Sequence, residues 1–155
     1  MNPIRRSFLK LSGALGAMTA FAAAGVLKTT QAAAATWNKS GFESKVLAEA
    51  MKSLGASGAT ESRDIVITAP DIAENGAVVP VEVISRIPNT QSISIISEKN
   101  PFPLAATMEF ANGAEPYAYV RIKMGQTSNV RAVVNAGGKF FTAAKEVKIT
   151  IGGCG

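Results

Sequence analysis

Histidine is absent from this 155-residue chain, and cysteine occurs only once, as Cys154. The absence of histidine removes the usual general base, the Ser-His-Asp arrangement and the commonest zinc ligand. A single cysteine cannot form an intramolecular disulfide, and it cannot supply a Cys-x-x-Cys site of the zinc or thioredoxin type. The sulfur of Cys154 is therefore the main candidate for covalent chemistry.

Acidic residues are absent from the first 35 positions, although these positions hold four of the 16 basic residues: Arg5, Arg6, Lys10 and Lys28. The formal net charge of +5 therefore comes mostly from this segment. A nucleic-acid-binding protein carries a clustered basic face. In the rest of this chain lysine and arginine are scattered among glutamate and aspartate, so we expect no nucleic-acid partner.

The first 34 residues have the organisation of an export signal. An apolar run rich in glycine and alanine ends at Lys28 and leads to an A-x-A cleavage site. The basic group before it resembles a twin-arginine signal: Arg5, Arg6, Phe8, Leu9 and Lys10. A transmembrane anchor is the alternative, but a span needs about 20 apolar residues. We expect cleavage after Ala34, a periplasmic location and no membrane anchor after cleavage.

One amphipathic helix is predicted over Gly41–Leu54. Ser40-Gly41-Phe42-Glu43 has the S-x-x-E pattern of a capping box, and Gly55 suits the position after the helix, where φ is positive. Apolar residues then recur at helical spacing and predict a face that docks on the domain: Phe42, Val46, Leu47, Ala50, Met51 and Leu54.

Strand patterns dominate from residue 64 onward, in seven or eight short segments at intervals of about 8 to 12 residues. They span residues 64–68, 78–85, 92–97, 105–111, 117–124, 129–135, 139–142 and 145–151. Pro80 indicates an edge strand or the beginning of a strand. The spacing predicts that residues 35–151 form a mainly β domain, an immunoglobulin-like antiparallel β-sandwich with one N-terminal helix.

Residues 152–155 are predicted to form a flexible C-terminal arm. Gly152, Gly153 and Gly155 flank Cys154 and add conformational freedom without side-chain bulk. No histidine or adjacent lysine activates the thiol, and a C-terminal carboxylate one residue away disfavours its thiolate. The pattern indicates an exposed thiol on which other proteins perform the chemistry, which is the behaviour of a carrier and not of an enzyme.

Other functions remain open from the residues alone. The chain fits an exported binding or structural β-sandwich whose terminal cysteine is incidental or joins two copies by a disulfide. A thiol-redox enzyme would need an activated thiolate and usually a resolving cysteine. Lipidation fits poorly, because Cys154 is not fourth from the end and no cysteine follows the signal.

The C-terminal residues, the export signal and the β-rich domain together resemble the SoxY family, the sulfur-carrier subunits of bacterial thiosulfate oxidation. The resemblance covers the terminal Ile-Gly-Gly-Cys-Gly and three further stretches, residues 73–81, 100–107 and 138–141. That family usually ends in Gly-Gly-Cys-Gly-Gly, and this sequence shows one glycine fewer. The resemblance implies that Cys154 carries sulfur intermediates covalently and that no other cofactor is bound.

The same resemblance implies a set of partners. These are a SoxZ-like β-sandwich subunit, a c-type Sox cytochrome that couples thiosulfate to the thiol, a hydrolase that releases sulfate, and a sulfur dehydrogenase. A disulfide-linked dimer of the carrier complexes is a further expectation. Export of a folded complex would explain a twin-arginine signal on the carrier.

Overall fold

The computed structural model describes residues 37–111 and 113–150 of the chain. The predicted export signal, including Arg5 and Arg6, lies outside the described residues, as does the predicted arm of residues 152–155 with Cys154. None of the helices within the described ranges has the length and apolar character needed to cross a membrane.

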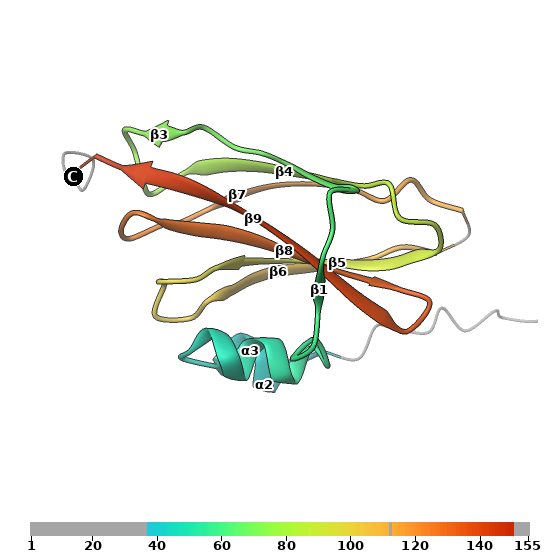
Figure 1. Ribbon diagram of the computed structural model, residues 1–155. Coiled ribbons are helices and arrows are strands. Elements are labelled where there is room, and N and C mark those ends of the chain that lie inside the picture. Colours follow the sequence, from blue (N-terminus) through green and yellow to red (C-terminus); the bar gives the residue numbers. More distant parts are fainter. Residues whose placement is uncertain (1–36, 112, 151–155) are drawn as a thin grey trace, which may run out of the picture. The chain divides into compact units, whose positions relative to one another are not determined.

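Two β-sheets and two short helices make up the described part of the chain (Figure 1). The larger sheet has the strand order β1-β9-β8-β5-β6, with β3 also paired to β9, and the smaller sheet has the order β2-β4-β7. The strands are β1 Thr60–Glu61, β2 Ile65–Thr68, β3 Ile72–Ala73, β4 Val79–Ser85, β5 Thr90–Ser97, β6 Leu104–Glu109, β7 Tyr117–Ile122, β8 Ser128–Ala136 and β9 Lys139–Ile149.

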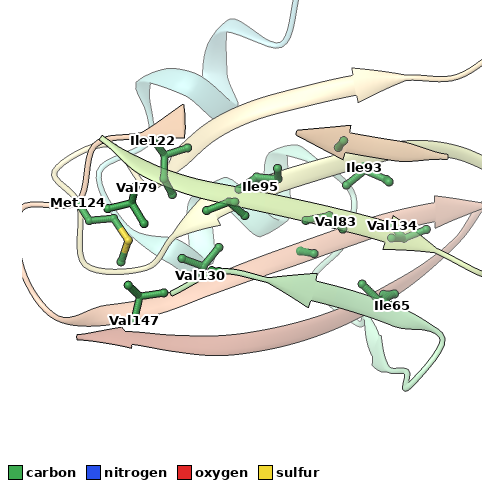
Figure 2. Packing of buried hydrophobic residues seen from close by; sticks show 14 of the residues in the cluster. Ile65, Val79, Val83, Ile93, Ile95, Ile122, Met124, Val130, Val134 and Val147 are labelled. Carbon is green, nitrogen blue, oxygen red and sulfur yellow. The ribbon is translucent and has the colours of Figure 1, made fainter. Parts of the chain in front are cut away.

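The main hydrophobic core lies between the two sheets (Figure 2). Alternate residues of β4 and β7 point inward from the small sheet, and alternate residues of β5 and β8 meet them from the large sheet. Val83, Ile95 and Val134 are fully buried in this core. The predicted mainly β, immunoglobulin-like sandwich is therefore confirmed.

A second, smaller core covers the outer face of the large sheet. The helices α2 (Lys39–Glu43) and α3 (Leu47–Ser53) pack on this face. Ala50 of α3 is fully buried in a cluster that includes Ile96 and Leu104 of the sheet. The end of β5 is thus covered on both faces, which explains why Ile95 and Ile96 are both apolar: Ile95 lies in the main core and Ile96 in the second core.

The prediction of one helix over Gly41–Leu54 is wrong, because the chain leaves the helical conformation at Ser44, with ψ of 138°, and resumes it after Val46. The first helix is capped by Asn38, whose side chain accepts from the Gly41 N–H, and not by Ser40. Asn38 also donates to the carbonyl of Ser53. These contacts fold α2 back against α3. The contacts between the two helices therefore outweigh the helical spacing of the apolar residues, which had predicted one continuous helix.

Close packing of the two helices explains the position of the break. A Cβ on Gly41 would stand 2.6 Å from Oγ of Ser53 and 3.0 Å from a methyl of Leu104. Glycine therefore allows α2 to approach both α3 and the sheet. The end of α3 agrees with the sequence, because Gly55 follows it with φ of 75° and donates to the Lys52 carbonyl.

Most predicted strands are confirmed, with two differences in β9. Residues 139–142 and 145–151 were assigned to separate segments, but β9 is continuous over Lys139–Ile149. Its two neighbours β1 and β3 pair with it in parallel, which adds two short parallel ladders to an otherwise antiparallel fold. Pro80 is tolerated near the beginning of β4, because β2 pairs only with residues 82–85 of that strand.

Candidate functional site: the base of the C-terminal arm

The path of β9 determines where the predicted arm begins. This strand pairs with β8 from Lys139 to Val147, after a hairpin turn in which Gly137 and Gly138 both have positive φ. Val147 is fully buried in the main core. Cys154 follows the last described residue, Thr150, by four residues. Four residues span at most about 14 Å, which sets the longest possible distance between Cys154 and Thr150.

A short segment, residues 69–76, runs alongside the end of β9 and pairs with it in parallel through β3, and we call it the strap. Its strand β3 places Ile72 opposite Lys148 and Ala73 opposite Ile149. The Lys148 N–H donates to the Asp71 carbonyl over 2.9 Å, and the Thr150 N–H donates to the Ala73 carbonyl over 3.2 Å. The backbone of β9 is therefore held by the strap up to the last described residue.

Lys145 fastens the beginning of the strap to the side of β9. Its Nζ lies 2.7 Å from the carbonyl oxygen of Ala69 and 3.0 Å from Oδ1 of Asp71. From the sequence, Lys145 is predicted only to begin the last strand segment, residues 145–151. In the structure its ammonium group already donates to the strap, so its role there is to hold the strap in place.

Gly76 lets the strap pass close to the β7–β8 connection. The Met124 N–H donates to the Gly76 carbonyl over 2.7 Å. A Cβ on Gly76 would lie 2.4 Å from the carbonyl oxygen of Met124 and 3.1 Å from a side-chain carbon of Ile149. The Ile149 N–H donates to Oγ1 of Thr127 over 3.0 Å, which holds the end of β9 from a second direction.

These contacts hold the end of β9 in place up to the last described residue. No group of three histidine, cysteine, aspartate or glutamate residues that could hold a metal ion occurs among residues 37–111 and 113–150. No strand is predicted for the strap, which lies between the predicted segments 64–68 and 78–85. A two-residue strand carries no periodicity, so the pattern of apolar and polar residues could not predict β3.

Comparison with known proteins relates this chain to the same family by its sequence and by its fold. Residues 50–154 match the family model of the sulfur oxidation protein SoxY. A solved structure, the sulfur carrier protein SoxY from Chlorobium limicola f thiosulfatophilum, is 40% identical in sequence. The alignment covers 69% of this chain and 94% of that chain, with a TM-score of 0.62.

A more distant likeness concerns the fold alone. A superoxide reductase (neelaredoxin) from Ignicoccus hospitalis is 22% identical, with 57% of this chain and 81% of that chain covered and a TM-score of 0.50. None of the curated proteins matches the chain.

The family match covers more than half of the chain and includes the strap, β9 and the single cysteine. The sheets and the strap therefore belong to the part of the chain that is shared with the family. The chain is a member of the SoxY family.

Proposed function

We propose that this protein is a covalent sulfur carrier in thiosulfate oxidation and that Cys154 is its attachment site. One observation carries the proposal: the family match runs through residue 154 and so includes the only cysteine of the chain. The 40% identical SoxY from Chlorobium is itself described as a sulfur carrier protein. The fixed end of β9 supports the same function, because it gives a short glycine-flanked segment a rigid point of attachment.

The chemistry of the cycle defines what the thiol must do. Oxidative coupling of thiosulfate to Cys154 forms an S–S bond and releases one proton and two electrons, which the c-type cytochrome partner accepts. Hydrolysis of the resulting thiosulfonate consumes water and releases sulfate and a proton, which leaves a persulfide on Cys154. The carrier is the substrate of both steps, and its partners supply the catalytic groups.

The proposed location and partners follow from the same family. A twin-arginine signal in residues 1–34 would deliver the folded chain to the periplasm together with a SoxZ-like β-sandwich subunit. There the cytochrome, the sulfate-releasing hydrolase and the sulfur dehydrogenase would act in turn on sulfur held by Cys154. Gly152, Gly153 and Gly155 would let the thiol enter their active sites without side-chain obstruction.

Intact-mass spectrometry tests the proposal. The mature protein is purified without reductant from cells that grow on thiosulfate, beside a Cys154→Ser variant. We expect adducts whose masses correspond to added sulfur atoms or to a thiosulfonate, and we expect the variant to lack them. A wild-type thiol that stays unmodified, in cells whose thiosulfate oxidation is unchanged by Cys154→Ser, would refute the carrier function.

A further inference from the structure

A cavity of about 550 Å³ lies between the helical segment and the outer face of the large sheet. Small-molecule sites in proteins have volumes of about 300–1,000 Å³ and combine aromatic walls with a few polar groups. Twelve described residues line this cavity, and they come from residues 37–54 and from β5, β6, β8 and β9. Asn135 and Phe140 are among them, and they flank the β8–β9 turn, where β9 begins. The base of the arm is at the other end of β9.

One row of residues, in register across four strands, forms the floor of the cavity. In order from β9 to β6, the floor consists of Phe140, Asn135, Ser92 and Glu109. Residues directly opposite each other on neighbouring strands have their side chains on the same face of a sheet. The strand pairing thus brings a ring, an amide, a hydroxyl and a carboxylate to the same side of the large sheet.

The polar side chains of the floor differ from those of the next row, Ser94 and Thr107, whose hydroxyl oxygens lie 2.9 Å apart and bond to each other. Oδ1 of Asn135 is buried and has no hydrogen-bond partner among the described residues. An amide has oxygen and nitrogen ends of similar size, so a half-turn presents this acceptor to the cavity. Because buried polar groups in native proteins are normally paired, a molecule with N–H donors would supply what this acceptor lacks.

Glu109 gives the cavity its charge. It is the only charged residue among the twelve that line the cavity, and it is exposed on the edge strand β6. Glu109 belongs to none of the ion pairs formed within residues 37–111 and 113–150. A cleft that carries charge of one sign raises the local concentration of ions of the other sign. The cavity therefore favours a cation over a neutral molecule or an anion.

Trp37 adds a large aromatic surface to the wall of the cavity. Its ring stacks on Phe42, with centroids 4.3 Å apart and planes inclined by 6°, and yet Trp37 is 66% exposed. Because Phe42 covers one face of the indole, the exposed area comes from the other face and the edges. Among aromatic side chains, tryptophan attracts a cation over its ring most strongly. The wall thus has the same preference as the carboxylate.

We propose that this cavity binds a small organic cation with a flat amidinium or guanidinium group. The flat group donates two parallel N–H bonds to Glu109, and the apolar part of the ligand lies on Trp37. A planar fork of donors matches a carboxylate and stacks on aromatic rings, whereas a compact ammonium offers only a point charge. The site is independent of the carrier function, because none of the twelve residues belongs to the strap or to the predicted arm.

Fluorescence titration of the purified protein with three molecules of similar shape tests the proposal, because Trp37 is the only tryptophan of the chain. The probes are benzamidinium, a cation; benzamide, which is neutral; and benzoate, an anion. We expect benzamidinium to change the Trp37 emission saturably and to bind at least about tenfold more tightly than benzamide. Benzoate is expected not to bind. Equal affinities of benzamidinium and benzamide, or no saturable binding of benzamidinium, would overturn the proposal.

A pair of glutamate variants separates the carboxylate from the general charge of the surface. Glu109→Gln should weaken benzamidinium binding about tenfold and leave benzamide binding unchanged. Glu146→Gln is the matched control, because Glu146 is exposed on β9, an even number of residues from Phe140 and so on the same face of the sheet. It should bind benzamidinium like the wild type. Wild-type affinity of Glu109→Gln, or an equal loss in both variants, would rule out the pairing with Glu109.

Trp37→Ala tests the aromatic wall and is read by NMR, because this variant has no tryptophan. In the wild type we expect benzamidinium to shift the backbone amide signals of Ser92 and Asn135, which lie in the floor. The same shifts should occur in Trp37→Ala with an affinity about threefold or more weaker. The exposed position of Trp37 makes the variant compatible with folding. Shifts confined to residues outside the cavity, or an unchanged affinity of Trp37→Ala, would contradict the proposed site.

Discussion

At the scale of single residues, the phenol of Tyr117 has an acidic neighbour, Glu82, on the adjacent strand β4. Burial, followed by the charge of Glu82 and a hydrogen bond to it, raises the pKa of Tyr117 above its ordinary value of 10.0. Each of these influences favours the neutral phenol over the phenolate. Tyr117 and Tyr119 are two residues apart in a predicted strand and so share one of its faces, but the register of β4 and β7 is needed to show that Glu82 lies beside them.

Replacing Glu82 with Gln is therefore expected to lower the pKa of Tyr117 toward its ordinary value. The measurement is the rise in tyrosinate absorbance with pH in a Tyr119→Phe background, where Tyr117 is the sole tyrosine. The folded state holds the proton of Tyr117 more tightly than the unfolded state does. The contribution of this group to the free energy of unfolding is therefore fully present below the pKa of the unfolded state, and it is lost as the pH rises through the pKa of the folded state. An unchanged titration midpoint would mean that Glu82 does not act on Tyr117.

At the scale of elements, the strap at the end of β9 depends on the absence of a side chain at Gly76. In Gly76→Ala the new methyl group would meet the Met124 carbonyl, so the strap must move and its hydrogen bonds to β9 must lengthen. Overpacking of this kind costs about 1–3 kcal/mol. We expect faster hydrogen exchange at the amides of Lys148 and Thr150, measured by NMR.

Gly125→Ala is the matched control for this variant. Gly125 follows Met124 directly, but a Cβ there has no atom within 4 Å and its φ is not in the left-handed region. Its exchange rates at Lys148 and Thr150 should equal those of the wild type. If Gly76→Ala behaves like Gly125→Ala, then the strap does not hold the end of β9.

The strands with regular alternation could be predicted from the sequence, whereas the helix break and the length of β9 could not. β4, β7 and β8 were predicted because apolar and polar residues alternate along them as the sandwich requires. The break between α2 and α3 was not, because it depends on contacts of Gly41 with Ser53 and Leu104, which are distant in sequence. The continuity of β9 was hidden by residues 143–146, where the alternation is weak. The candidate thiol was found from composition alone, whereas its supporting strap was not.

At the scale of the whole domain, two cores share one sheet. The main core joins the two sheets, and the smaller one joins the helices to the outer face of the large sheet. Ile95 is fully buried in the first, and Leu104 is 3% exposed in the second. Because the helices touch only one side of the sheet, we infer that they detach in a partial opening that leaves the sandwich intact.

Detachment of the helices before the sandwich unfolds predicts a specific pattern of hydrogen exchange. Ile95→Ala and Leu104→Ala each remove a buried side chain and should each lower the free energy of unfolding by about 2–5 kcal/mol. Ile95→Ala affects the intact and the helix-detached states equally, so it should speed exchange at the β8 amides of Ala132 and Val133. It should not speed exchange at the amide of Leu54, which follows α3 and donates to the Ala50 carbonyl. Leu104→Ala destabilises only the state in which the helices are docked, so it should speed exchange at all three amides. Faster exchange of Leu54 in Ile95→Ala would show instead that helices and sandwich open as a single cooperative unit.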